Sequence, residues 1–162
     1  MNRFKTLAVA VLSLVWLAAP SAYAQNSAQQ LQGSWVLTFG ADPNVHSAQP
    51  GVGVMQFTRD GGVTELLNTI MPPGLMTTDG LGEWARVGEN QFVATVVFAV
   101  ASGTPGVGPI GFFKQHFSLR YSADRTELTA SYQWALTGMD GTPFFGGEGT
   151  AILRRIGVAN PF

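Results

Sequence analysis

The stretch LQGSWVLTF, from Leu31 to Phe39, opens the part of the chain that is patterned like a folded domain. It places a Gly-x-Trp triplet, Gly33 to Trp35, at the head of an apolar run. An apolar run bounded by turn-forming residues predicts a β-strand. The triplet marks either the first strand of a ligand-binding β-barrel or an ordinary amphipathic strand that contains a tryptophan.

The residues before this stretch have the pattern of an export signal. Arg3 and Lys5 form a positively charged start, Leu7 to Ala19 form an apolar core, and Ala22-Tyr23-Ala24 is a small-x-small cleavage site. The apolar run is shorter than the roughly 20 residues that a membrane-spanning helix needs. The alternative is a signal that is retained as a membrane anchor.

We therefore expect a signal peptide over residues 1–24 and one domain over residues 25–162. The domain would be exported, to the periplasm or the medium, without stable membrane insertion. Its chain has no cysteine, which excludes disulfides and a lipid-modified cysteine.

Composition favours an all-β domain without nucleic-acid partners. Removal of residues 1–24 leaves seven Lys and Arg against ten Asp and Glu, a net charge of about −3. This balance offers no electrostatic reason for binding nucleic acid or an anionic membrane surface. Charged residues make up only 12% of the chain, and it contains 20 glycines. Few charges and many glycines, with short β-branched and aromatic runs, are typical of strands joined by many turns.

Turn residues divide the domain into eight predicted strands. Alternation is clearest from Glu127 to Thr137, where Leu128, Tyr132 and Trp134 share one face. The predicted strands are Gly33–Phe39, Val52–Thr58, Gly62–Ile70, Leu81–Val87, Gln91–Val100, Ile110–Tyr121, Glu127–Thr137 and Gly149–Ile156.

The connections between these strands alternate strictly between short and long. The short ones are RDG, GEN and SADRT, and the long ones are GADPNVHSAQPG, MPPGLMTTDG, ASGTPGVGP and GMDGTPFFGG. In an up-and-down meander, all tight turns would lie at one end and all long loops at the other. Eight such strands can close into a barrel that holds one small ligand. The alternatives are a β-sandwich and a half-open barrel.

Apolar residues are frequent in the long connections, where they suit entry of an apolar guest at a barrel mouth. They are Met71, Leu75, Met76, Val107, Met139, Phe144 and Phe145.

The Gly-x-Trp strand, the eight-strand meander and the basic pair in AILRRI resemble the calycin superfamily, and in particular bacterial lipocalin-like exported barrels. The resemblance implies that Gly33 and Trp35 lie at the closed end of the barrel. It also implies that an arginine of the last strand, Arg154 or Arg155, stacks on Trp35. A guanidinium over an indole is worth about 0.5–2 kcal/mol. The classical family also has a second signature between later strands and usually a helix before the last strand, and neither is clearly recognisable in the sequence.

Three residues are candidates for proton transfer. Glu65 would be buried if it shares an inward face with Val63 and Leu67, and solvated if Leu66 and Ile70 point inward. The pattern does not decide, and a solvated Glu65 is the expectation. His116 alternates with Lys114 and is expected to face outward. Tyr132 is the third candidate.

Two histidines without ligand-spaced carboxylates give no reason to expect a metal, and no cofactor is expected. The glycines in SGTPGVGPIG are followed by no lysine and do not predict a phosphate loop.

Aromatic side chains with a few polar groups on the inward faces would either line an apolar pocket or fill a core. The candidate ligand-binding residues are Trp84, Phe98, Gln115, Phe117, Tyr132 and Trp134.

The sequence thus predicts an exported barrel that binds a small hydrophobic molecule. The alternatives are an isomerase or cyclase on the same scaffold, working without metal, and a structural envelope protein with a packed barrel. The oligomeric state is left open.

Overall fold

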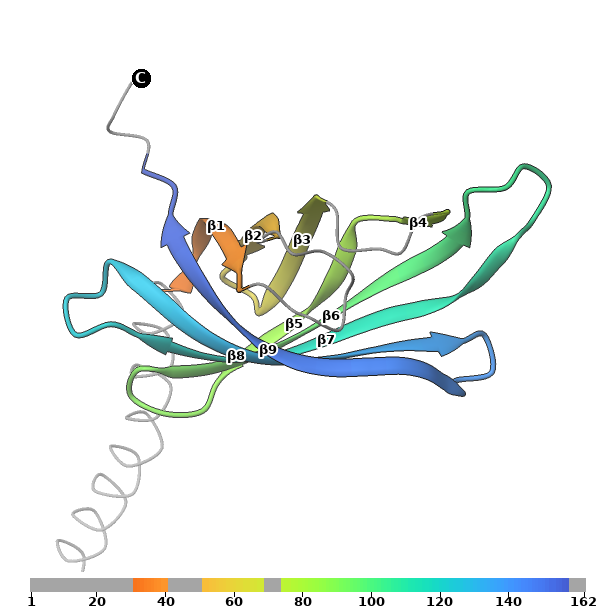
Figure 1. Cartoon of the computed structure of the whole chain (residues 1–162). Helices are drawn as coiled ribbons and strands as arrows, with labels where there is room; N and C mark the ends of the chain where they lie inside the picture. Colours follow the sequence, from red (N-terminus) through yellow and green to blue (C-terminus); the bar gives the residue numbers. More distant parts are fainter. Residues whose placement is uncertain (1–30, 41–50, 69–73, 158–162) are drawn as a thin grey trace, which may run out of the picture. The chain divides into compact units, whose positions relative to one another are not determined.

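The computed structural model describes residues 31–40, 51–68 and 74–157, so the predicted signal peptide lies outside the described residues. Nine strands form one antiparallel sheet (Figure 1). They are β1 (Gly33–Phe39), β2 (Val52–Phe57), β3 (Gly62–Asn68), β4 (Leu75–Thr77), β5 (Gly80–Arg86), β6 (Gln91–Ser102), β7 (Pro109–Tyr121), β8 (Glu127–Gly138) and β9 (Pro143–Arg155).

Eight of these strands close into an up-and-down barrel. The order runs β1-β2-β3-β5-β6-β7-β8-β9, and β9 pairs again with β1. The predicted all-β, eight-stranded barrel is confirmed, and the sandwich alternative is wrong. Closure leaves most backbone groups of the short strands paired on both sides.

The strand bounds differ from the prediction at the end of the long connections. The last strand starts at Pro143 instead of Gly149, so Met139–Thr142 is a tight turn where a long loop was expected. The short strand β4 was not predicted and pairs with the last residues of β6. Hairpins β6–β7 and β8–β9 therefore extend past β1, β2 and β3 (Figure 1). Cross-strand pairing with long neighbours allows Gly- and Pro-containing segments to stay extended.

The barrel core follows an alternation that is clearest in β1 and β7. In β7, every second residue from Gly111 to Tyr121 is buried, and the residues between them are exposed. The same pattern holds in β1, where Trp35, Leu37 and Phe39 are buried. Side chains on one face of a strand point the same way, so these buried positions face the interior.

An aromatic chain fills the end that carries the tight turns. The ring centroids lie 6.0 Å apart for Trp35 and Tyr121, 5.7 Å for Tyr121 and Phe92, and 6.0 Å for Phe92 and Trp84. Phe57 continues the chain at 6.2 Å from Trp84. Tilted and edge-to-face rings of this kind stabilise a core beyond their buried area. We call this region the closed end.

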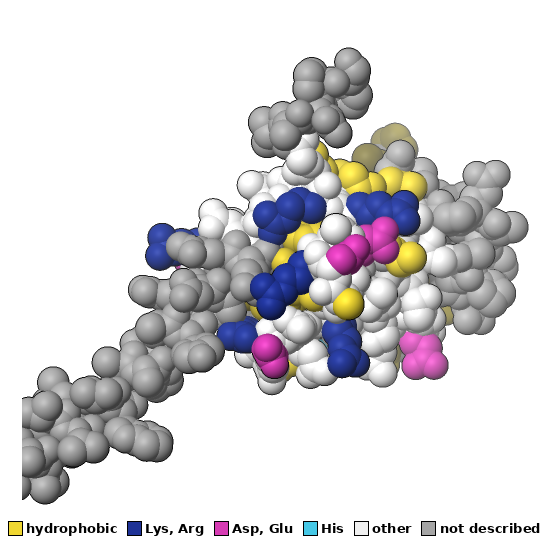
Figure 2. Space-filling view, turned by 90° about the vertical axis from the view of Figure 1, so that its left-hand side faces the viewer, with side chains coloured by type: hydrophobic (Ala, Val, Ile, Leu, Met, Phe, Trp, Pro, Cys, Tyr) yellow, Lys and Arg dark blue, Asp and Glu magenta, His cyan; other side chains and the backbone are white. Residues whose placement is uncertain are grey.

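Arginines surround the closed end. Figure 2 looks onto this side of the molecule and shows Lys and Arg side chains, in dark blue, spread across it. All but one of the lysines and arginines in the described residues stand on the tight turns or strand ends here. They are Arg59, Arg86, Arg120, Arg125, Arg154 and Arg155, while Lys114 stands on the outer wall.

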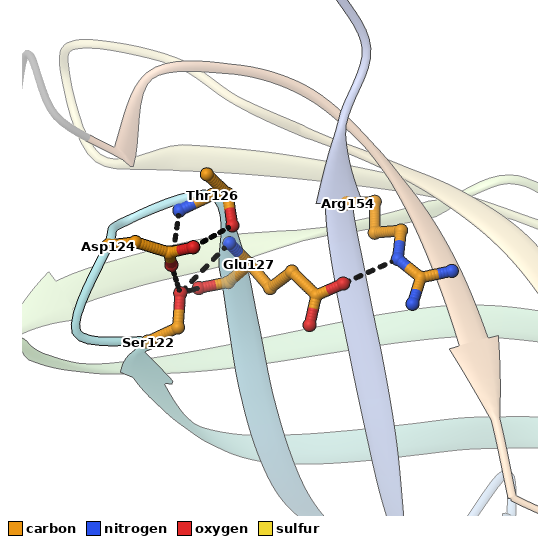
Figure 3. Close-up of polar contacts among 5 residues, drawn as sticks. All are labelled: Ser122, Asp124, Thr126, Glu127 and Arg154. Atoms are coloured by element: carbon orange, nitrogen blue, oxygen red, sulfur yellow. Dashed lines mark hydrogen bonds and ion pairs between the residues drawn. The ribbon is translucent and has the colours of Figure 1, made fainter.

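Two of the arginines at this end make contacts that stabilise a turn or join neighbouring strands. Arg86 donates to the backbone oxygens of Gly88 and Glu89, at 2.6 and 2.7 Å, and so braces the β5–β6 turn. Arg154 Nε donates to Glu127 Oε1 at 2.6 Å, joining neighbouring strands (Figure 3).

A carboxylate organises the β7–β8 turn in the same close-up (Figure 3). Asp124 accepts hydrogen bonds from Ser122 Oγ at 2.7 Å and from the backbone N–H of Thr126 at 3.2 Å. The Thr126 hydroxyl donates to its second oxygen at 3.0 Å. These donors, led by the Ser122 hydroxyl, lower the pKa of Asp124. Asx-type bonding of this kind fixes a turn from local sequence alone.

Candidate functional site

Glu65 in β3 faces the barrel interior. Its side chain is completely buried, whereas the neighbouring Leu66 is 49% exposed. The expectation of a solvated Glu65 is therefore wrong, and Ile70 lies outside the described residues. The physical reason is register: Glu65 is paired with Met55, and both share an inward face with Val63. A one-residue change of phase decides the face of every side chain in a strand.

Gln115 in β7 is the hydrogen-bonding partner of Glu65. The Gln115 amide nitrogen lies 3.0 Å from Glu65 Oε2 and 3.3 Å from Oε1, with the amide placed so that its nitrogen faces the carboxyl. The Gln115 side chain is also buried, with 1% exposure. Strands β3 and β7 are not neighbours in the barrel, so this contact crosses the interior.

Burial raises the pKa of Glu65 from 4.5 to about 8. Desolvation penalises the charged carboxylate, and no ion pair of Glu65 with a cation is found among the described residues. The neutral acid is favoured near pH 7, where it can both donate and accept a hydrogen bond. Carboxyl groups in this state occur at sites that bind or transfer protons, and also in structural networks.

Trp134 in β8 stands beside this pair. It is the direct register partner of Gln115, and its ring lies 5.7 Å from that of Phe113. The indole lies over Gly147 of β9, where an added Cβ would come within 2.8 Å of Nε1. Trp134 Nε1 is buried and has no hydrogen-bond partner within the described part of the chain. An unsatisfied buried donor costs about 1–3 kcal/mol, so it calls for an explanation.

Tyr132 and Phe117 lie deeper along the same two strands. Their ring centroids are 5.7 Å apart, and Tyr132 meets Phe39 edge-on at 5.1 Å. Tyr132 lies over Gly149, as Trp134 lies over Gly147, since a Cβ at Gly149 would be 2.6 Å from the Tyr132 hydroxyl. Two glycines on the inner face of β9 thus make room for two large side chains.

Phe98 and Trp84 take different places in the interior. Phe98 is buried against Phe113, at 5.6 Å, and lies over Gly80, the register partner of Glu65. Phe98 therefore belongs with the Glu65 group. Trp84 donates its N–H to Thr58 O at 3.0 Å and is part of the closed-end aromatic chain, on the side of the tight turns.

We call Glu65, Gln115, Trp134, Phe98 and Phe113 the polar-aromatic cluster. It brings together one carboxyl group, one amide group, one unpaired indole N–H and three aromatic rings, from strands β3, β6, β7 and β8. Four of its members were candidates from the sequence as ligand-binding or proton-transfer residues, and Phe113 was not.

His116 is on the outer wall, in the orientation expected for it. Its Nδ1 lies 2.9 Å from the Thr95 hydroxyl, and its side chain is exposed. It therefore does not meet Glu65 or Tyr132. An open hollow of about 460 Å³ borders it, lined by outward-facing residues together with Trp134 and Gly147. The lining residues are Lys114, His116, Gln133, Trp134, Ala135, Gly147 and Glu148.

The apolar residues of the predicted mouth are largely exposed where they are described. Their exposures run from 50% for Val107 to 66% for Phe145, with Met76, Met139 and Phe144 between. Leu75 is half-buried, and Met71 lies outside the described residues. Several of these residues stand on strands β4 and β9 instead of loops.

At the closed end, the predicted group of Gly33, Trp35, Arg154 and Arg155 separates into two contacts. Arg155 lies over the Trp35 ring, with 4.8 Å between its guanidinium carbon and the ring centroid. Arg154 instead pairs with Glu127. Gly33 has a φ of 129°, a conformation that favours glycine, at the start of β1.

Two features are absent from residues 31–40, 51–68 and 74–157. No group of three His, Asp or Glu side chains is arranged to hold a metal ion. No helix there is long and apolar enough to cross a membrane.

The chain matches no protein-family model, no curated protein and no solved structure. The site must therefore be interpreted from its own geometry.

Proposed function

We propose that this protein is an exported barrel of the calycin type that binds a small, largely apolar molecule in its interior. The observation that carries the proposal is the buried Glu65–Gln115 pair, enclosed by aromatic rings. A barrel that needed only a packed core would gain stability from apolar side chains at both positions, because an isolated buried carboxyl is costly. Ligand sites, in contrast, combine apolar walls with a small number of polar groups.

Inner-face glycines allow the rings of the polar-aromatic cluster to pack against the barrel wall. Phe98 occupies the space over Gly80, and Trp134 occupies the space over Gly147. Apolar residues at the opposite end from the tight turns are exposed, which suits the approach of an apolar molecule. The signal-like residues 1–24 support export.

Native mass spectrometry tests the proposal directly. The protein, expressed from its full-length sequence and purified without added ligand, should carry a small molecule that is absent from a denatured control. An environment-sensitive apolar probe should also bind to it and be displaced by that molecule. A protein that carries nothing and binds no apolar probe would refute the proposed function.

Two glutamines provide matched variants for locating the site. Gln115→Leu changes the interior, whereas Gln133→Leu changes the outer hollow one strand away. We expect probe binding to weaken in Gln115→Leu and to remain within twofold of wild type in Gln133→Leu. The reverse pattern would place the ligand in the hollow on the outer wall.

A second function, proton-transfer isomerisation, is favoured by the inward position of Glu65. The ionised Glu65 carboxylate, which forms as the pH rises through about 8, can remove a proton next to a ligand carbonyl and return it at another carbon, with no net change in atoms. Incubation of the protein with a ketone in D₂O would report this as deuterium incorporation at the α-carbon. Glu65→Gln should abolish the exchange, and absence of exchange in the wild type would leave binding as the function.

A further inference from the structure

We propose that the polar-aromatic cluster recognises the carbonyl oxygen of an apolar ketone or related neutral carbonyl compound, with Trp134 Nε1 and Glu65 as the two hydrogen-bond donors. This inference rests on the proposed function and names the class of ligand that the interior would take.

The first argument is the unpaired N–H of Trp134. Its Nε1 is buried, lies against the backbone of Gly147, and has no acceptor in the described part of the chain. Buried indole N–H groups normally find a partner. A ligand oxygen beside the Trp134 ring would supply the missing acceptor.

The second argument is the position of Glu65 relative to Trp134. Gln115 joins the two, because it is the register partner of Trp134 and its amide contacts the Glu65 carboxyl. The Gln115 amide nitrogen lies 3.0 and 3.3 Å from the two oxygens of that carboxyl. In its protonated form, Glu65 also carries an O–H donor. A ligand oxygen held near Trp134 has two lone pairs and can accept one hydrogen bond from the indole N–H and one from Glu65.

The third argument concerns charge. Other titratable side chains in phase with the inward faces of the described strands are Tyr132 in β8, with Tyr121, Arg86 and Arg155 at the closed end. The structure places Met55 of β2 and Gly80 of β5 beside Glu65 in register, Phe98 of β6 over Gly80, and the Gln115 amide of β7 against the carboxyl. No cation faces Glu65 there, so a carboxylate ligand would meet no partner. An ammonium ligand would require ionisation of Glu65, which burial disfavours.

A ligand series on one carbon skeleton tests the inference. Binding of 2-decanone, 2-decanol, decylamine, decanoate and decane to the protein would be measured by calorimetry at pH 6.5. We expect the ketone to bind about tenfold more tightly than decane, as two modest hydrogen bonds would give, and more tightly than decylamine or decanoate. Equal binding of ketone and alkane, or tightest binding of the amine, would overturn the inference while leaving the proposed function in place. If no member binds and no co-purified molecule is found, the proposed function itself fails.

Conservative variants assign the donors. Trp134→Phe keeps an aromatic ring and removes the N–H, so ketone affinity should fall about threefold to tenfold while decane affinity stays within twofold. Glu65→Gln keeps a neutral donor and should retain ketone binding, whereas Glu65→Leu should lower it to the level of decane. Unchanged ketone affinity in both Trp134→Phe and Glu65→Leu would overturn the assignment.

A pH titration tests the role of Glu65 on the wild-type protein, so the result does not depend on whether a variant folds. Ketone affinity should decrease as the pH rises through about 8, where Glu65 loses its proton. Decane affinity should not follow this curve. Ketone affinity that is flat from pH 6 to 9.5 would contradict Glu65 as a donor.

Discussion

The guanidinium carbon of Arg155 lies 4.8 Å from the centroid of the Trp35 ring, while its neighbour Arg154 turns to the other face of β9 and pairs with Glu127. Adjacent residues of a strand point to opposite faces, so only one of the two arginines can cover the indole. Trp35 itself is completely buried at the closed end. The contact joins the first and last strands at the point where the barrel closes.

Trp35→Ala should lower the free energy of unfolding by about 3–5 kcal/mol, because it opens a cavity among the closed-end rings. Equilibrium denaturation in urea, followed by circular dichroism, measures this. Ligand binding in the fraction that remains folded should be retained, since Trp35 belongs to the closed-end aromatic chain and not to the polar-aromatic cluster. A variant as stable as wild type would contradict a structural role for Trp35.

Replacement of the two arginines should have different consequences. Arg155→Ala removes a cation–π contact and should cost about 0.5–2 kcal/mol, with a change in tryptophan fluorescence. Arg154→Ala removes a surface ion pair in which Arg154 is 70% exposed, and should cost at most about 1 kcal/mol, less in 1 M NaCl. A change in fluorescence for Arg154→Ala and none for Arg155→Ala would reverse the assignment.

Stability should decrease as the pH rises between about 4.5 and 8. Burial raises the pKa of Glu65 from 4.5 to about 8, so the folded protein holds a proton that the unfolded chain releases. The contribution of Glu65 to the free energy of unfolding is fully present below pH 4.5 and is lost as the pH passes 8. The full change between these limits is on the order of 5 kcal/mol. Glu65→Gln should remove this dependence and be more stable than wild type at pH 9. Denaturation curves at pH 5, 7 and 9 would give the free energy of unfolding of both proteins. If it changed with pH in the same way in both, Glu65 would not be the source of the pH dependence.

Two glycines in one short segment should differ sharply in their tolerance of alanine. A Cβ at Gly111 would lie 1.8 Å from the backbone oxygen of Thr137 in β8, which cannot move without disturbing the pairing. Gly108 has nothing within 4 Å of such a Cβ. Gly111→Ala should therefore cost about 1–3 kcal/mol or more, whereas Gly108→Ala should leave the thermal midpoint within about 2 °C. Equal tolerance at both sites would show that β7 and β8 approach less closely there.

Several features could be predicted because local chemistry specifies them. The first strand has the predicted bounds, and the turn at Ser122–Thr126 forms from Asp and Ser side chains that bond to the nearby backbone. Alternation placed His116 outside and Phe117 inside. The last strand was predicted too short, because Gly146 and Gly147 reduce strand propensity, and only pairing with β8 keeps them extended.

The polar-aromatic cluster could be predicted only in part. Gln115 and Trp134 were identified from the alternation of two long strands, whereas Phe98 was named from a strand that is apolar almost throughout. Glu65 was assigned to the wrong face because Val63, Leu66 and Leu67 make both faces of β3 apolar. Pairing with Met55 resolves the choice, and no local pattern contains that information.

The sequence by itself determined that the chain forms eight barrel strands in antiparallel order, because turn residues and alternating apolar positions act over short distances. Only the tertiary structure decided which arginine meets Trp35 and which face of β3 is buried. It alone brought Glu65 together with Gln115, from strands that are not neighbours. Closure of a barrel sets such contacts through the register of all eight strands at once, and a buried carboxyl is tolerated only where that register supplies its partner.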